Sequence, residues 1–187
     1  VGHKSLKFNY NGESFKNKIL NYPLGGNGLT SRLSKIREEG GETYGIGSYF
    51  SGDKHGGSFG IFSNISTKGT VKSIAELITI TEEYINNGVK QEELTITKQN
   101  MINSELMGYE SNYDKLFLLL SIISNDLPKN YSEQQKVIIN SMQKSDIDKL
   151  AKKSINPDEF IIVIAGNKYV IQKELKELGY KITDINY

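Results

Sequence analysis

The chain has 187 residues, of which 37% are hydrophobic and 24% are charged, a balance typical of a globular protein with a sizeable core. Its 23 basic and 22 acidic side chains leave a net charge of +1, which does not support nucleic acid or an anionic membrane as a partner. Because the chain has no cysteine, disulfides, thiol catalysis and cysteine-ligated metal sites are excluded. Its longest apolar runs, Leu116–Leu120 and Phe160–Ala165, are too short to cross a membrane.

The N-terminal segment combines one strand pattern with two helix patterns. Ser5–Tyr10 alternates apolar and polar residues, which predicts a strand, and a short helix is predicted over about Phe15–Tyr22. A second helix is predicted further on because apolar residues recur at helical spacing, at Leu29, Leu33 and Ile36. We expect Thr30 or Ser31 to cap this helix and Gly40-Gly41 to end it.

Two strands joined by a glycine-rich turn follow. Tyr44–Ser51 and Ser58–Thr67 both alternate, and the polar turn between them predicts an antiparallel pair. Four residues of the first strand are expected to share one face: Tyr44, Ile46, Ser48 and Phe50. Four residues of the second are expected to do the same: Phe59, Ile61, Ser63 and Ile65. One face of this pair is predicted to lie on the core.

The middle of the chain is predicted to be helical. An apolar stripe that stops at Gly88 is formed by Val71, Ile74, Ile78 and Ile85. Gln91–Met107 and Asn112–Asn125 are predicted to be the next two helices. Capping-box pairs predict two more helix starts, Ser132 with Gln135 and Ser145 with Asp148. Asn156-Pro157 is expected to stop the last of these helices.

The C-terminal segment returns to strand patterns. Phe160–Ala165 is a continuous apolar run, predicted to be a strand buried on both sides or near the centre of a sheet. A short helix over Val170–Leu178, closed by Gly179, precedes a last predicted strand at Lys181–Ile185. This order predicts an α+β fold: a two-layer sandwich in which helices cover one face of a largely antiparallel sheet. With no repeat or linker visible, residues 1–187 are predicted to form a single domain.

The residues for metal or nucleotide chemistry are few. The two histidines, His3 and His55, are far apart in sequence, and no helix carries a histidine pair with an intervening glutamate. A self-contained zinc site is therefore not expected, and His55 is interpreted as a solvated loop residue. A serine–histidine–acid site is given little weight, because His55 is the only plausible base. Gly26 and Gly28 approach a nucleotide-binding pattern, but a glycine-rich bend between two helices is favoured over that function.

Only two arginines occur in the chain, Arg32 and Arg37, and every other basic residue apart from the histidines is lysine. Arginine offers a planar, forked guanidinium that lysine cannot replace. Arg37 and Tyr44 stand at the two ends of a helix-to-strand turn, where they could bind a carbonyl oxygen or a developing oxyanion. Composition alone favours a simpler interpretation, in which Arg37 pairs with a nearby surface glutamate and Tyr44 is a core aromatic.

The order of motifs in this segment resembles a known family. Three strings follow one another: Asn21-Tyr22-Pro23-Leu24-Gly25-Gly26, Ser31-Arg32-Leu33, and Ile36-Arg37-Glu38-Glu39-Gly40-Gly41-Glu42-Thr43-Tyr44-Gly45. They are similar to the second-half signature of the M16 zinc metallopeptidases (pitrilysin, insulinase and mitochondrial processing peptidase), which runs Leu-Gly-Gly, Ser-Arg-Leu, Arg-Glu, Gly, Tyr. The resemblance continues to Phe160–Gly166 and so covers nearly the whole chain. Glu42 departs from it, since the family more often has an apolar residue there.

The resemblance implies a protein of two halves that close like a clamshell, with zinc and a His-x-x-Glu-His motif on one half. This chain lacks that motif, so it resembles the other, C-terminal half; any zinc would be on a partner half of the same polypeptide or of a separate subunit. By motif, Arg37 would bind a peptide carbonyl and Tyr44 would assist the tetrahedral intermediate. The resemblance gives Arg32 no catalytic role, so Arg32 is interpreted as structural, tied to a carboxylate or to helix-end carbonyls.

The sequence therefore predicts the substrate-binding, non-metal half of an M16-like zinc metallopeptidase, inactive alone, with peptide as substrate. Two alternatives remain: a non-catalytic structural or assembly domain of the same fold, and a nucleotide-binding module that uses Gly26 and Gly28. Because the chain opens with Val1, we expect a processed form or a fragment of a longer chain. The resemblance favours the bacterial periplasm or cell envelope as the compartment.

Overall fold

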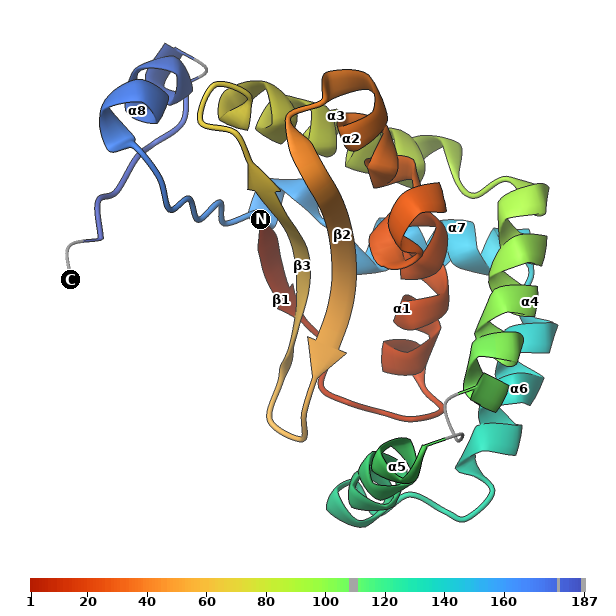
Figure 1. The fold of residues 1–187 in the computed structure, drawn as a ribbon. Coiled ribbons are helices and arrows are strands. Elements are labelled where there is room, and N and C mark those ends of the chain that lie inside the picture. Colours follow the sequence, from red (N-terminus) through yellow and green to blue (C-terminus); the bar gives the residue numbers. More distant parts are fainter. Residues whose placement is uncertain (108–110, 178, 186–187) are drawn as a thin grey trace.

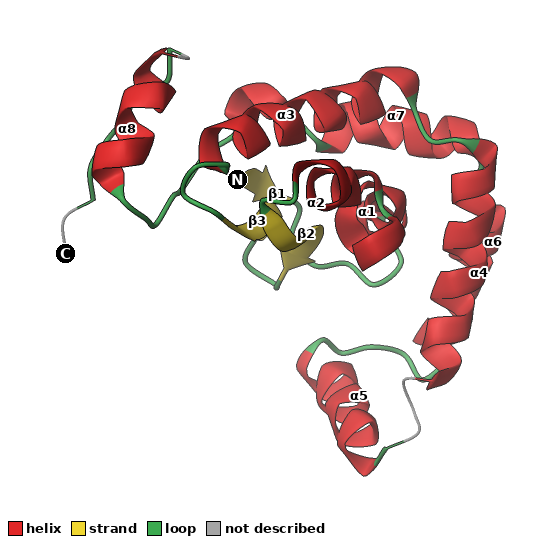
Figure 2. Ribbon diagram, turned by 45° about the horizontal axis from the view of Figure 1, so that its top comes forward, coloured by secondary structure: helices red, strands yellow, loops and turns green. Residues whose placement is uncertain are grey.

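The computed structural model describes residues 1–107, 111–177 and 179–185. Its strands form one antiparallel sheet of order β1-β3-β2, made of β1 (Gly2–Ser5), β2 (Thr43–Gly52) and β3 (Gly57–Ile65). Helices lie on one face of this sheet, as Figures 1 and 2 show. The opposite face presents Tyr49 and Phe62 to solvent. The predicted α+β class, with helices on one face of an antiparallel sheet, is confirmed.

The helix that packs directly on the sheet is α1 (Glu13–Asn21), close to the predicted range. Its apolar residues Phe15, Ile19 and Leu20 are buried, because they recur on one helical face. The long helix α3 (Thr70–Asn87) joins this core through Tyr84, whose hydroxyl donates to the carbonyl of Leu20 at 2.7 Å. This hydrogen bond satisfies a carbonyl near the end of α1.

The glycine-rich stretch after α1 is wound into short turns rather than a regular helix. Tyr22–Gly26 forms a π-turn, and the predicted helix from Leu29 is divided, because Ser31 has extended backbone angles. Single 3₁₀ turns stand on either side of Ser31, and α2 (Lys35–Gly40) begins only after them. The prediction that a Thr30 or Ser31 side chain caps this helix is therefore wrong, since no such cap bond forms. Gly41, at φ +65°, ends α2 as predicted.

The remaining helices cover the core and extend beyond it at both ends. Their bounds are α4 (Gln91–Met107), α5 (Asn112–Ser124), α6 (Tyr131–Ser141), α7 (Lys144–Ser154) and α8 (Lys168–Glu177). In both ribbon views α5 and α8 stand at the two ends, outside the layers (Figures 1 and 2). Helix α5 has no buried residue, whereas α8 buries Ile171 and Leu175 against α3.

Both predicted capping boxes are wrong. Helix α6 begins at Tyr131, so Ser132 lies inside its first turn rather than before it. Helix α7 begins after Gln143, whose backbone N–H donates to Asp146 Oδ2 at 2.9 Å. Asp148 instead accepts the Val89 N–H at 2.9 Å, which ties the start of α7 to the loop after α3. The serine-based pattern missed this because a glutamine can occupy the capping position.

Three predicted strands differ from the structure. The first strand lies earlier, at Gly2–Ser5, since β3 offers partners only down to Gly57, where the hairpin turn begins. Within Phe160–Ala165 only Ile161 pairs, in a single bridge with Gly2, and Ile161 and Val163 are 70% and 71% exposed. The prediction of a buried central strand is therefore wrong for the described residues, because a strand needs a ladder of hydrogen bonds and only one bridge forms here. Lys181–Ile185 is not a strand either.

Candidate functional site

The turn between α2 and β2 carries the two predicted site residues. Arg37 is half-buried in the last turn of α2, and its side chain forms no hydrogen bond or ion pair with any residue that the structure describes. Tyr44 is 98% exposed at the start of β2. The predicted surface pairing of Arg37 is therefore absent from the described contacts, and Tyr44 is not a core aromatic. Both polar groups remain available to a ligand.

A break in strand register decides where Tyr44 faces. Thr43 pairs with Ile65 and Ile46 pairs with Ser63, so one extra residue is accommodated in β2 as a bulge. Thr43 and Ile46 both point into the protein, and Tyr44 is turned out to solvent. The prediction that Tyr44 shares a face with Ile46 is wrong, since the bulge removes the alternation on which it depended. The signal in the sequence was Gly45, because glycine inside a strand often marks a bulge.

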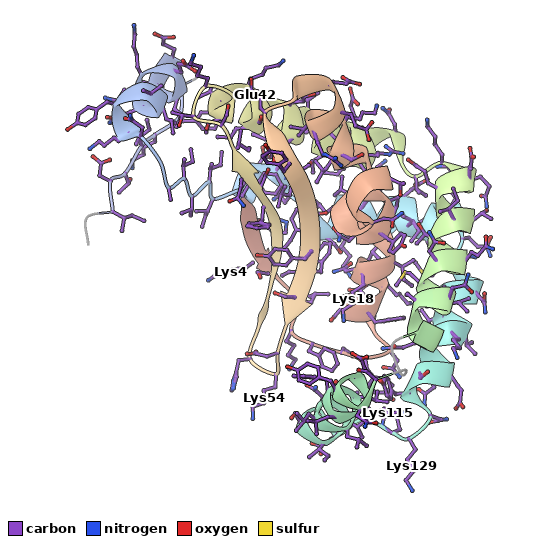
Figure 3. The ribbon with its side chains drawn as sticks, in the orientation of Figure 1. Lys4, Lys18, Glu42, Lys54, Lys115 and Lys129 are labelled. Carbon is purple, nitrogen blue, oxygen red and sulfur yellow. The ribbon has the colours of Figure 1, made fainter. Side chains whose placement is uncertain are left out.

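Polar contacts hold this bulge in place. The Thr43 hydroxyl lies 2.7 Å from the carbonyl oxygen of Asn64 and accepts the Gly45 N–H at 3.1 Å. Next to Thr43, the side-chain carboxylate of Glu42 accepts a hydrogen bond from the Ser66 hydroxyl. The backbone carbonyl of Glu42 accepts the Ser66 N–H at 2.9 Å. Figure 3 places Glu42 at the end of the sheet where β2 begins. Glu42 therefore ties the turn to the loop after β3, and the backbone that presents Tyr44 is fixed.

Arg32 is committed to contacts within the protein. Its guanidinium donates to Glu93 through Nε (2.8 Å to Oε1) and Nη2 (2.6 Å to Oε2), and Nη2 also donates to the Gly88 carbonyl at 2.8 Å. The same group lies 4.7 Å from the centre of the Tyr84 ring. The interpretation of Arg32 as a structural residue, tied to a carboxylate and a helix-end carbonyl, is confirmed. Sequence reasoning did not identify Glu93 as the partner.

The surroundings of Glu93 and Tyr84 shift the pKa values of both side chains. Burial, the largest influence on Glu93, would raise the pKa of its carboxyl. The hydrogen bonds from Arg32 and from the Lys90 N–H outweigh that effect and hold the pKa below its ordinary value. Burial raises the pKa of the Tyr84 phenol. The Arg32–Glu93 pair is therefore charged at neutral pH and links the turn before α2 to the start of α4.

The glycines before Arg32 serve close packing. Asn21 donates from Nδ2 to the Ser48 carbonyl at 2.7 Å, and the Ser48 hydroxyl donates to Asn21 Oδ1 at 2.6 Å. A β-carbon on Gly25 would lie 2.6 Å from the Ser48 backbone nitrogen, so only glycine fits here. Helix α1 precedes this stretch, so the strand-to-helix context that nucleotide binding by Gly26 and Gly28 requires is absent.

The histidines do not form a metal site. His3 is buried in β1, where it stacks on Phe160 and accepts the Asn156 N–H on Nε2 at 3.3 Å. His55 is exposed in the hairpin turn, as predicted. Among the described residues no group of three or more histidine, cysteine, aspartate or glutamate side chains could hold a metal ion. The described residues therefore do not fit a zinc centre.

A comparison with models of known protein families agrees with the fold and with the motifs of the α2–β2 turn. The model of the peptidase M16 inactive domain matches residues 7–101. This chain belongs to the M16 peptidase family. The resemblance drawn from the ordered motifs between Asn21 and Gly45 is thereby confirmed. The name of the matching domain, an inactive one, agrees with the lack of a metal-binding group in the described part of this M16 chain.

Known M16 relatives extend the match beyond the motif. The chain is 30% identical over 156 residues to the non-peptidase homolog YmxG of Helicobacter pylori, covering 82% of this chain and 35% of that protein. It superposes on the peptidase M16 inactive domain from Pseudomonas fluorescens with a TM-score of 0.72 at 25% identity, covering 84% of this chain and 38% of that one. The periplasmic protease PqqL from Escherichia coli gives a TM-score of 0.63 at 16% identity, covering 82% of this chain and 17% of that one.

The matches cover only part of each relative. The M16 chain spans about a third of the length of YmxG and of the Pseudomonas fluorescens protein. In the part of the chain that the structure describes, no helix is both long and apolar enough to span a membrane.

Proposed function

We propose that this chain is the substrate-binding, non-metal half of an M16-like zinc metallopeptidase, and that Arg37 and Tyr44 contribute to its active site. The observation that carries the proposal is that neither side chain is used to hold the fold together. Arg37 has no partner among the described residues, and Tyr44 is 98% exposed on a bulge that other residues hold. Arg32, which has no catalytic role by motif, is fully engaged instead.

The roles proposed follow from the chemistry of the two groups. The Arg37 guanidinium would donate hydrogen bonds to a peptide carbonyl, and the Tyr44 hydroxyl would donate to the oxyanion of the tetrahedral intermediate. Zinc, with a glutamate base, would be held by a partner half bearing His-x-x-Glu-His and would activate the attacking water. Alone, this chain would neither bind stoichiometric zinc nor cleave peptides.

The position of the peptide is part of the same proposal. β1 pairs with β3 only over Gly57–Gly60, so beyond Ile61 this edge of β3 has no strand partner among the described residues. A hollow of about 550 Å³ lies along the edge, lined in part by Phe62, Ile65 and Val163. The hollow extends from Ser58 to Ile65, and Ile65 pairs with Thr43, next to Tyr44; this supports strand addition of an extended peptide here.

The experiment is mutagenesis of the intact peptidase that contains this half, whether one polypeptide or two subunits. We expect Arg37→Ala and Tyr44→Phe each to lower kcat/KM about 10²-fold or more, as loss of a transition-state donor does elsewhere. Lys35→Ala and Tyr113→Phe are matched controls, because both side chains are exposed and neither lines the hollow proposed for the peptide. Full activity of both site variants would refute the catalytic roles, and zinc-dependent cleavage by this chain alone would refute the assignment to the non-metal half.

A second candidate function is favoured by one finding. The curated relative YmxG is named a non-peptidase homolog, which supports a non-catalytic structural or assembly domain of the same fold. In that case the intact protein would show no zinc-dependent peptidase activity, while removal of this half would still dissociate or unfold its partner. Measuring activity and assembly on the same preparation separates the two functions.

The organisation and compartment are also proposed. Residues 1–187 would form a single C-terminal-half domain of a longer protein or a separate subunit. The bacterial periplasm or envelope would be the compartment, as the name of the periplasmic relative PqqL suggests. Fractionation of cells that express the intact protein tests this assignment.

A further inference from the structure

A second cavity lies at the opposite end of β2 from Tyr44. It has a volume of about 450 Å³ and is enclosed by the segment after β1, by α1 and by the end of β2. At about 3.3 Å per strand residue, the seven steps from Tyr44 to Ser51 place it about 23 Å from the proposed active-site turn. The cavity is therefore separate from the site described above.

A buried amide without a partner lines this cavity. Asn17, on α1, is only 1% exposed, yet neither Nδ2 nor Oδ1 forms a hydrogen bond. A buried amide normally finds partners, because leaving them unmade costs free energy. Asn17 therefore leaves one amide acceptor and one amide donor unpaired at the wall of the cavity.

A lysine stands beside that amide. Lys18, the next residue of α1, lines the same cavity, and Figure 3 shows it beside the end of β2. Its side chain is exposed and forms no ion pair with a described residue, and its Nζ lies 6.0 Å from the centre of the Phe8 ring. Desolvation by neighbouring atoms lowers the pKa of Lys18. The one carboxylate in the lining, Asp53, accepts the N–H groups of His55 and Gly56 in the hairpin turn. Lys18 is therefore an uncompensated cation at this cavity.

Part of the remaining wall is apolar. Leu6, Phe8 and Phe50 line the cavity from the two strand-side segments. Small polar side chains complete the lining: Ser5, Ser14, Ser51 and Asn125. A ligand that matches Lys18, Asn17 and the apolar part needs a carboxylate for Lys18, an N–H for Asn17 Oδ1, an acceptor for Asn17 Nδ2, and an apolar group.

We propose that this cavity binds the C-terminal residue of a peptide, or an N-acylated amino acid of the same chemistry. The carboxylate would bind Lys18, the amide N–H would donate to Asn17 Oδ1, and the apolar side chain would lie against Phe8 and Phe50. The site does not depend on the proposed peptidase function, since it uses none of the same residues.

The test is titration of the 187-residue chain with N-acetyl-leucine, followed by amide chemical shifts in two-dimensional NMR. We expect saturable shifts that include the Asn17 side-chain amide. N-acetyl-leucinamide, which lacks the carboxylate, should bind at least about tenfold more weakly, the equivalent of one charge-assisted hydrogen bond. Acetate, which keeps the carboxylate but lacks the amide and the apolar group, should also bind at least about tenfold more weakly, because it loses the amide hydrogen bonds and the apolar contact. A short peptide with a free C-terminal leucine should shift the same resonances.

Variants separate the site from a structural cavity filled with water. Lys18→Met should weaken binding about tenfold, whereas Lys16→Met, on the same helix but outside the lining, should not. Asn17→Leu should abolish binding while raising the melting temperature, because an unpartnered buried amide is replaced by an apolar group of similar size. Absence of saturable shifts, or unchanged binding in Lys18→Met and Asn17→Leu, would show a water-filled cavity and overturn the proposal.

Discussion

Replacing each of the two arginines with alanine should have very different consequences for stability. Arg32→Ala removes two charge-assisted hydrogen bonds to Glu93, one to the Gly88 carbonyl, and the contact with the Tyr84 ring. Breaking a fully buried ion pair costs about 3–5 kcal/mol, because the remaining charge is stranded. Here the Glu93 side chain is 24% exposed and can be partly hydrated, so we expect a loss of about 2–3 kcal/mol.

The comparison with Arg37 makes this expectation specific. Arg37→Ala should change the free energy of unfolding by less than about 0.5 kcal/mol, since no described residue pairs with its guanidinium. Urea unfolding followed by circular dichroism measures both variants, and thermal scans should show a fall of about 5–10 °C for Arg32→Ala alone. Equal stabilities of the two variants would refute the division of the arginines into a structural and a functional one.

Two further predictions concern the same framework. The depressed pKa of Glu93 stabilises the fold fully above the ordinary glutamate range, near about pH 4.3, and this stabilisation is lost as the pH falls through the lower folded-state pKa. Glu93→Gln should therefore be less stable than wild type at about pH 7 and lose less stability than wild type on acidification to about pH 3, measured by urea unfolding; parallel pH curves would contradict this. Gly25→Ala should cost about 1–3 kcal/mol, because its β-carbon would collide with Ser48, whereas Gly45→Ala, with open space around it, should stay within about 0.5 kcal/mol. Similar urea midpoints for the two glycine variants would count against the close packing at Ser48.

The helices and the hairpin could be predicted from the sequence because their signals are local. Helix α4 has the predicted bounds, Gln91–Met107, and Gly41 ends α2 where the glycine pair indicated. The β2–β3 pair was expected from alternation and a glycine-rich turn between the strands. Residues within a few positions of one another carry these signals, so one sequence is sufficient to detect them.

The strands at the chain ends could not be predicted in this way. The apolar run at Phe160–Ala165 has strong strand propensity, but a strand exists only where another strand accepts its hydrogen bonds. β1 offers one bridge, at Gly2, and the run then leaves the sheet. Propensity was overruled by the availability of a partner, which no local pattern records.

The sequence by itself determined the family and the residues of the candidate site. The order from Leu24 to Tyr44 is a linear signature, and a linear signature survives without coordinates. Which arginine was engaged was decided by the tertiary structure, because the partner of Arg32 lies 61 residues away. The bulge after Thr43 likewise turned Tyr44 from the expected core face to the solvent. In both cases the deciding hydrogen bonds join segments distant in sequence, and only folding brings their donors and acceptors together.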